Sequence, residues 1–240
     1  MISDNLHSVR ARIAAACNTA GRDVNLVTLL AVSKTFGPEA VLEAIAAGQT
    51  AFGENYIQEA VQKIQHIRQW EAAHPLRPSQ PSQPSEWHCI GPIQSNKTRL
   101  VAENFDWVHT LDRLKIAERL SEQRPAHLPP LQVCLQVNID DGPNKSGVAP
   151  QDLAALAAAV AKLPRLCLRG LMAIPEPTPD LVANDLCLLS AYTLFSSMKS
   201  EHASVDCFSL GMSADLEPAI QNGSTMVRIG TAIFGNRDKH

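Results

Sequence analysis

Short apolar segments alternate with amphipathic helical segments along almost the whole chain. The first apolar segment, residues 26–32, is a nearly continuous hydrophobic run, which is typical of a strand buried on both faces of a parallel sheet. Further strands are predicted at 50–53, 87–91, 107–110, 131–138, 167–174, 206–210 and 225–229. The first helix between strands starts at Pro38 and ends at Gly48, and others are predicted at 55–69, 97–104, 113–123, 151–162, 183–200 and 215–222.

This alternation predicts a parallel sheet with right-handed crossovers. Eight strand–helix units favour closure into a (β/α)8 TIM barrel over an open sheet. Residues 4–20 form a further amphipathic helix before the first strand, which we expect to be an N-terminal addition to the barrel. The fold class is therefore α/β, with a single domain over residues 1–240.

One segment interrupts the alternation. Pro75, Pro78, Pro81 and Pro84 recur at every third position among serine and glutamine residues. This spacing favours an extended polyproline II conformation. We interpret residues 75–85 as a solvated loop insertion between the second helix and the third strand, although a ligand for a proline-reading domain would have the same pattern.

Composition excludes several classes of partner. The formal net charge of −3 gives no electrostatic reason to expect nucleic acid or an anionic membrane surface. No apolar run reaches the roughly 20 residues that span a bilayer, and the N-terminus does not have the pattern of a signal peptide. The six cysteines form no C-x-x-C pair, which favours reduced thiols over disulfides or a metal site. We therefore expect a soluble, cytoplasmic protein.

Lys34 directly follows the first predicted strand. Functional groups of β/α barrels gather at the carboxyl ends of the strands, so we expect this ammonium at the barrel mouth and partly desolvated. Desolvation lowers the pKa of a lysine and exposes a nucleophilic amine, which can form a Schiff base with a carbonyl compound such as the aldehyde of pyridoxal 5'-phosphate (PLP). Taken alone, Lys34 could also be a lysine that reaches from a loop into solvent.

The loops after the seventh and eighth predicted strands carry glycine beside a hydroxyl residue, at Gly211 with Ser213 and at Gly230 with Thr231. Many barrels bind phosphate in these two loops, through backbone N–H groups, hydroxyls and a helix N-terminus. Either loop alone could be a turn glycine with a helix-capping hydroxyl. Both loops together, in a barrel with a lysine on its first strand, indicate a phosphate site.

Arg228 lies two residues before Gly230, so strand alternation directs both toward the same side. An arginine near a pyridine nitrogen keeps that nitrogen unprotonated, because two adjacent positive charges repel. PLP is then a poorer electron sink than it is beside a carboxylate. This predicts restricted chemistry.

Three other polar residues are weaker candidates. Lys145 lies in Gly-Pro-Asn-Lys-Ser-Gly, which does not have P-loop spacing, and we expect an exposed loop lysine there. Lys97 lies in Ser-Asn-Lys at 95–97, which is typical of the N-cap of a helix, although this segment could reach the barrel mouth. His88 is as consistent with a buried core histidine as with a ligand contact. The histidines show no metal-ligand spacing.

Five segments together resemble one known family. They are AVSK at 31–34, FGENY at 52–56, WHCIGPIQSNK at 87–97, SLGMS at 209–213 and TMVRIGTAIFG at 225–235. From about residue 5 to residue 237 the chain is similar to the YggS-like pyridoxal phosphate homeostasis proteins, whose fold is that of the N-terminal barrel of alanine racemase. It departs from them at Cys89, where the family usually has a bulkier aromatic residue, and in its longer proline-rich segment.

The resemblance implies that PLP forms an aldimine with Lys34 and that its pyridine nitrogen meets Arg228. It further implies that the phosphate is bound by Ser213, Gly230 and Thr231. The rest of the cofactor would be contacted by Asn55, His88 and Met172.

The resemblance leaves a choice between a binding protein and an enzyme. Alanine racemases need a second base, a tyrosine from a C-terminal domain of the partner subunit, and this chain ends at His240, soon after the eighth predicted strand. Its tyrosines are Tyr56 and Tyr192, the latter in a predicted outer helix. We therefore expect a monomer that buffers PLP or hands it to PLP-dependent apoenzymes in vitamin B6 homeostasis, with no dedicated turnover. The alternatives are a slow amino-acid racemase and a class I aldolase that uses Lys34 without PLP.

Overall fold

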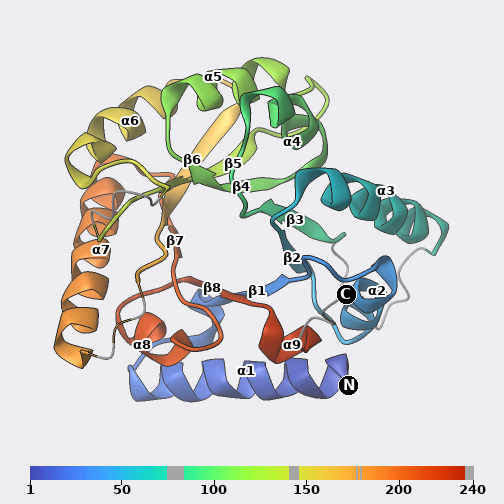
Figure 1. Cartoon of the computed structure of the whole chain (residues 1–240), viewed down its shortest axis with the longest axis horizontal. Helices are drawn as coiled ribbons and strands as arrows, with labels where there is room; N and C mark the ends of the chain where they lie inside the picture. The colour runs from blue at the N-terminus through green and yellow to red at the C-terminus, as the bar shows by residue number, and fades with distance from the viewer. Residues whose placement is uncertain (75–83, 141–145, 177, 179, 236–240) are drawn as a thin grey trace.

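The part of the chain that the structure describes forms a closed barrel of eight parallel strands, in which the last strand returns to pair with the first (Figure 1). The structure is a computed structural model that describes residues 1–74, 84–140, 146–176, 178 and 180–235. The strands are β1 (Thr28–Val32), β2 (Ala51–Glu54), β3 (Glu86–Cys89), β4 (Trp107–Leu111), β5 (Leu131–Gln136), β6 (Leu166–Met172), β7 (Cys207–Ser209) and β8 (Met226–Ile229). The predicted (β/α)8 barrel is confirmed.

Helices cover the outside of the barrel (Figure 1). They are α1 (Ile2–Thr19), α2 (Pro38–Ala46), α3 (Ile57–Ala73), α4 (Thr98–Asn104), α5 (Leu114–Gln123), α6 (Leu153–Val160), α7 (Leu181–Glu201), α8 (Leu216–Gln221) and α9 (Thr231–Phe234), with short 3₁₀ turns at Val24–Leu26, Ser95–Lys97 and Pro150–Asp152. Helix α1 is the predicted N-terminal addition. It packs against α2, α8 and α9, and so covers the barrel where β8 meets β1.

The start of β1 differs from the prediction. The apolar run begins at Leu26, but this residue ends a 3₁₀ turn and is 60% exposed. The turn forms because the Asp23 carboxylate accepts a hydrogen bond from the backbone N–H of Asn25, at 2.9 Å. Local capping by a short polar side chain therefore outweighs the apolar run.

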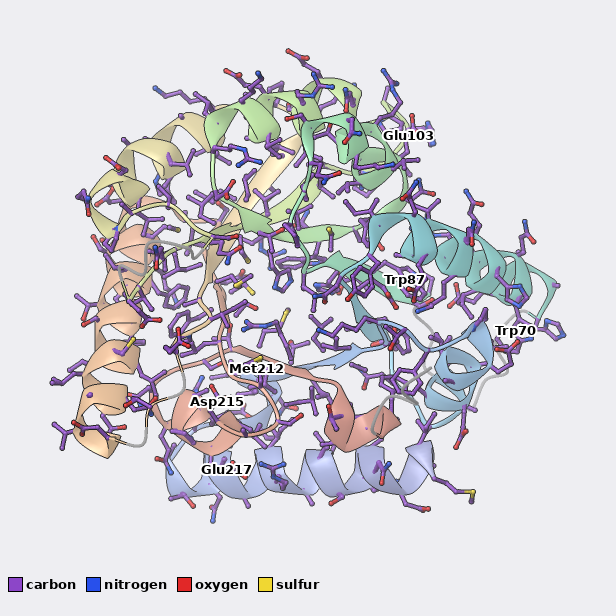
Figure 2. All side chains as sticks on the ribbon, in the orientation of Figure 1. Trp70, Trp87, Glu103, Met212, Asp215 and Glu217 are labelled. Atoms are coloured by element: carbon purple, nitrogen blue, oxygen red, sulfur yellow. The ribbon has the colours of Figure 1, made fainter. Side chains whose placement is uncertain are left out.

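The two faces of the strands meet different surroundings. Outward side chains, such as Phe52 and Trp87, are buried beneath the helices, and Figure 2 shows Trp87 on the side of α3. Inward side chains form a smaller apolar cluster of Leu30, Ala51, Trp107, Cys134, Met172, Cys207 and Met226. The barrel also encloses polar side chains that are almost fully buried, at His88, His109, Ser209 and Arg228. This is unusual, since branched apolar residues fill most barrels of this kind.

Two predictions fall outside the described residues. Residues 75–83 of the proline-rich segment and Lys145 are not among them. The six cysteines are described, and no disulfide joins any two of them in the described part of the chain. Within the described ranges, no helix is both long and apolar enough to cross a membrane.

Candidate functional site

Most of the predicted site residues meet at the carboxyl-terminal rim of the barrel. Strands β7, β8, β1 and β2 are consecutive neighbours, so the residues that follow them lie on one arc of this rim. These residues are Ser213 after β7, Gly230 and Thr231 after β8, Lys34 after β1 and Asn55 after β2. Gly230 lies close to β1, because a Cβ on this glycine would be 3.3 Å from the carbonyl oxygen of Val32. A larger residue would therefore crowd the strand that carries Lys34.

A buried ion pair fixes the backbone just before Lys34. The Lys63 Nζ donates to Glu54 Oε1 at 2.7 Å and to the Ser33 carbonyl oxygen at 2.9 Å. The Ser33 hydroxyl donates to the same Glu54 oxygen at 2.6 Å. Burial raises the pKa of Glu54, and the ammonium of Lys63 only partly offsets this effect. Lys63 and Glu54 thus fix both the carbonyl and the hydroxyl of Ser33, the residue before Lys34.

The residue after Lys34 is held as well. Thr35 has a positive φ of 70°, which is costly for a residue with a branched side chain. Its backbone N–H donates to Glu59 Oε1 at 2.9 Å, and that oxygen lies 3.4 Å from Lys63 Nζ. Side chains of α3 therefore anchor both neighbours of Lys34.

Sequence reasoning missed Lys63, although a signal was present. The buried face of α3 includes Ala60, Ile64 and Ile67, and Lys63 shares this face with only 3% of its side chain exposed. A lysine at a core position of an amphipathic helix requires a buried acceptor or counter-ion. Glu54, the last residue of β2, supplies it.

The loop that carries Ser213 is tied to the N-terminal helix. Arg12 of α1 donates to the Ser213 carbonyl oxygen at 3.1 Å and pairs with Glu217 at 2.9 Å. Within the loop, the Met212 N–H donates to Asp215 Oδ1 at 2.7 Å. Figure 2 shows Met212 and Asp215 on the connection between β7 and α8, with Glu217 on the side of α1. The Ser213 loop is thus fixed from both sides.

Arg228 lies inside the barrel, near the rim. Its Nη1 donates to the Ser209 hydroxyl oxygen at 2.8 Å, and its Nη2 donates to the Ala173 carbonyl oxygen at 3.0 Å. Only 5% of the residue is exposed. Burial lowers the pKa of Arg228 to about 10, so the guanidinium remains a cation near neutral pH.

Asn55 and Met172 lie at the carboxyl ends of β2 and β6, respectively. The Asn55 Oδ1 is buried and has no hydrogen-bond partner among the described residues. Such an atom is costly unless a ligand or water bonds to it. Met172 ends β6 and is fully buried in the interior cluster. Their predicted contacts with a cofactor stay predictions.

His88 lies deeper in the barrel than the other predicted residues. Its ring nitrogens contact His109 Nε2 at 2.9 Å and Glu86 Oε2 at 3.3 Å, and its ring stacks on Trp107 at 5.2 Å. Glu86 and Trp107 are the first residues of their strands, so the ring points away from the rim. Both of its nitrogens thus have protein partners, and the predicted cofactor contact of His88 stays a prediction.

The groups at the rim fit a ligand that combines an aldehyde with an anionic tail. Lys34 offers an amine, Ser213 and Thr231 offer hydroxyl and N–H donors, and Arg228 offers a buried cation. The Asn55 Oδ1, which has no partner among the described residues, leaves one acceptor at the rim for such a ligand. An amine beside anion-binding loops is the donor set that PLP requires.

Comparison with known proteins defines the class. The sequence model of the family described as "Alanine racemase, N-terminal domain" matches residues 5–238. The protein is therefore a β/α barrel of this class. An alanine racemase from Corynebacterium glutamicum has the same fold, with a TM-score of 0.66 and 16% identity over 100% of this chain and 62% of that one.

Closer relatives identify the family within this class. The chain is 54% identical over 237 residues to the pyridoxal phosphate homeostasis protein of Escherichia coli K12, covering 99% of this chain and 97% of that protein. It is 55% identical to the protein of that name from Pseudomonas aeruginosa PAO1, covering 99% and 96%. The chain belongs to the family of pyridoxal phosphate homeostasis proteins. Among solved structures, the chain is similar to PipY of Synechococcus elongatus with PLP bound. The TM-score is 0.79, and the identity is 32% over 98% of this chain and 100% of that one.

Proposed function

We propose that the protein holds PLP as a Schiff base on Lys34 and carries or buffers it without turning over a dedicated substrate. The anchoring of both neighbours of Lys34, beside two loops that offer phosphate donors, is the observation that carries this proposal. The inward side chain of Leu30 in β1 supports an inward direction for Lys34 as well, because strand alternation continued past Val32 would give both residues the same side. The PLP-bound structure of PipY supports the assignment by similarity.

The residues of the rim divide into three roles. Lys34 forms the covalent bond, and Arg228 meets the ring nitrogen. The phosphate contacts come from Ser213, Gly230 and Thr231, and Asn55 and Met172 lie around the remainder of the cofactor. His88 lies deeper in the barrel and acts on the cofactor only through its neighbours.

When bound, PLP supplies an electrophilic aldehyde carbon and a ring that can accept electron density. Arg228 limits the second property. Since it remains a cation near neutral pH, it disfavours a proton on the adjacent ring nitrogen. The two hydrogen bonds that hold its guanidinium keep this charge in place. The site therefore favours holding the cofactor over driving carbanion chemistry.

A slow amino-acid racemase is the second candidate, and Tyr56 is the residue that favours it. Tyr56 follows Asn55 at the rim, is 52% exposed, and lines with Asn55 and Lys97 a cavity of about 270 Å³. It could act as the second base. Tyr192 could not, because it lines a cavity with Glu86 and Thr28 at the opposite end of the barrel.

Absorbance and mass spectrometry test the carrier proposal. We expect purified protein with added PLP to show the visible band of a Schiff base, and borohydride to fix one cofactor to the tryptic peptide that contains Lys34. The band should vanish in Lys34→Ala and persist in Lys115→Ala, which changes an exposed lysine of α5. A band that persists in Lys34→Ala contradicts the proposal. Racemisation of amino acids that depends on both Lys34 and Tyr56 would instead support the enzyme.

We further propose that the protein acts in the cytoplasm as a monomer and passes PLP to PLP-dependent apoenzymes. The lack of a disulfide among the described cysteines agrees with a reducing compartment. The residues that we assign to PLP all come from one chain, so the site needs no second copy. Sedimentation velocity of the PLP-bound protein tests this, since a stable dimer at micromolar concentration would contradict it.

A further inference from the structure

A column of hydrogen bonds runs through the barrel from the rim to the floor. Arg228 Nη1 donates to Ser209 Oγ at 2.8 Å, and Ser209 Oγ lies 2.8 Å from His109 Nδ1. His109 Nε2 lies 2.9 Å from His88 Nδ1, and His88 Nε2 lies 3.3 Å from Glu86 Oε2. The first four side chains are almost fully buried, whereas 47% of the Glu86 side chain is exposed. These residues come from four strands, so the column links the two ends of the barrel.

The lower end of this column is open. Glu86 lines two cavities at the barrel floor, of about 440 Å³ and 510 Å³. Its other oxygen, Oε1, accepts a hydrogen bond from Trp107 Nε1 at 2.7 Å. Burial alone would raise the pKa of Glu86, but hydrogen bonds from His88 and Trp107 outweigh it and lower this pKa. Glu86 is therefore a carboxylate near neutral pH.

The chemistry of imidazole allows this column two arrangements that differ by one proton. When both histidines are neutral, His88 donates from Nε2 to Glu86, and its Nδ1 accepts from His109 Nε2–H. His109 Nδ1 then accepts from the Ser209 hydroxyl. When His88 takes one proton from solvent, both of its nitrogens donate. His109 must then accept at Nε2 and carry its hydrogen on Nδ1, from which it donates to Ser209.

The second arrangement changes how Ser209 holds Arg228. In the first, the hydroxyl gives its hydrogen to His109 and its oxygen accepts from Arg228 alone. In the second, the same oxygen accepts from both His109 and Arg228, and the hydroxyl hydrogen must find another acceptor. The added positive charge also repels the guanidinium. One proton at His88 thus weakens the contact that positions Arg228.

The charges around the histidine pair come from several strands. Burial lowers the pKa of His109 well below its usual range, and the neighbouring His88 and Arg228 act in the same direction. The other charged or titratable groups that face the column are Glu86 and Asp106 at the floor, Arg169 and its partner Asp206, Cys134 and Cys207 inside the barrel, and Asp215 near the rim.

We propose that His109 and His88 are positioning residues for Arg228, and that their column reverses its hydrogen-bond direction when His88 gains a proton. This inference rests on the proposed function only in naming PLP as the group that Arg228 meets. Proton uptake inside the barrel would then loosen the contact to the ring nitrogen while leaving Lys34 and the phosphate loops unchanged. The protein would hold PLP more weakly at acid pH for a reason that lies outside the Schiff base itself.

Histidine NMR on the PLP-free protein tests the reversal directly. In a pH titration, the nitrogen and carbon chemical shifts of the histidine rings distinguish the two tautomers and the charged form. We expect His109 to change from the Nε2–H to the Nδ1–H tautomer at the same midpoint at which His88 becomes charged. A His109 tautomer that stays constant while His88 titrates would overturn the proposal.

Two variants separate positioning from a merely structural role. In His109→Asn, the side-chain amide lies near the position of Nδ1 and can still bond to Ser209. In His109→Gln, the amide reaches the position of Nε2 and keeps only the bond to His88. In His109→Gln, Ser209 loses its bond to residue 109 and so holds Arg228 less firmly. We expect the PLP dissociation constant to be about tenfold higher in this variant, and to stay within about threefold of the original in His109→Asn.

The readouts keep this proposal apart from the carrier proposal. Equal weakening in both variants, with equal loss in unfolding temperature, would mean that His109 only fills space and would refute the positioning role. Absence of a Schiff-base band in the unchanged protein would refute the carrier proposal, whereas the NMR result on PLP-free protein stands independently of it.

Discussion

Replacing Lys63 with methionine tests the buried ion pair behind Lys34. Only 3% of the Lys63 side chain and 0% of the Glu54 side chain are exposed, and the charged atoms are 2.7 Å apart. Removing one partner of such a pair leaves the other buried and unpaired, at a cost of about 3–5 kcal/mol. The free energy of unfolding of a domain is about 5–15 kcal/mol in total, so we expect Lys63→Met to lose a large share of its stability.

The loss should depend on pH in a defined direction. Burial already raises the pKa of Glu54, and without Lys63 it rises further. The folded variant then binds this proton more tightly than the unfolded chain, in which the pKa is about 4.3. The deficit relative to the original protein should therefore shrink as the pH falls below the folded-state pKa of Glu54 in the variant, by up to about 1.4 kcal/mol per pH unit, until Glu54 of the original protein is protonated as well.

Urea unfolding of the PLP-free protein, followed by tryptophan fluorescence, measures these free energies. The double variant Glu54→Gln with Lys63→Met removes both charges, and we expect it to lose only about 1–2 kcal/mol. Since removing either partner alone should cost about 3–5 kcal/mol, a double-mutant cycle should then give a coupling energy of about 4 kcal/mol or more. Lys115→Met, which removes an exposed lysine of α5, should stay within about 0.5 kcal/mol of the original. A coupling energy near zero, or a Lys63→Met variant as stable as this control, would refute the reasoning.

Three further predictions concern the interior of the barrel. Because the pKa of His109 is lowered in the folded protein, the unfolded chain binds more protons below about pH 6.5, and the unfolding free energy should fall there by about 1.4 kcal/mol per pH unit. Urea titrations at several pH values should show that His109→Gln lacks this contribution to the pH dependence. In Gly91→Ala the added Cβ would be 2.1 Å from the Asn55 carbonyl oxygen, so calorimetry should show a loss of about 1–3 kcal/mol together with weaker PLP binding, and unchanged values would contradict the contact. Burial raises the pKa of Cys89 to about 12, so iodoacetamide should modify partly exposed Cys167 first in the native protein and both thiols equally in urea, as peptide mass spectrometry would show.

Local patterns in the sequence predict the barrel well, because each strand and helix carries its own periodicity. Strand β1 shows the limit: its apolar run begins at Leu26, but the 3₁₀ turn capped by the Asp23 carboxylate delays the start of the strand by two residues, to Thr28. The rim residues are also predictable, since the carboxyl ends of parallel strands must meet. Lys34 and Gly230 need only the order of the strands to be placed on the same arc.

The contacts across the barrel could not be predicted in this way. His109 and Ser209 are 2.8 Å apart at their side chains but belong to different, non-adjacent strands. Their meeting depends on the stagger of the closed sheet, which strand periodicity alone does not specify. The same holds for Lys63 and Ser33, which meet because α3 packs against the end of β1. The only sequence signal for this contact is the position of Lys63 on the buried face of α3, which indicates a buried partner.

The closure between β1 and β8 has a consequence for biosynthesis. A ribosome produces Lys34 early and the loop with Gly230 near the end, yet the two come together only when Leu29 of β1 pairs with Val227 of β8. A nascent chain that has exposed Lys34 thus cannot complete the proposed site until nearly all of it has been translated. If Lys34 holds PLP as proposed, only molecules that have completed their folding can capture the cofactor.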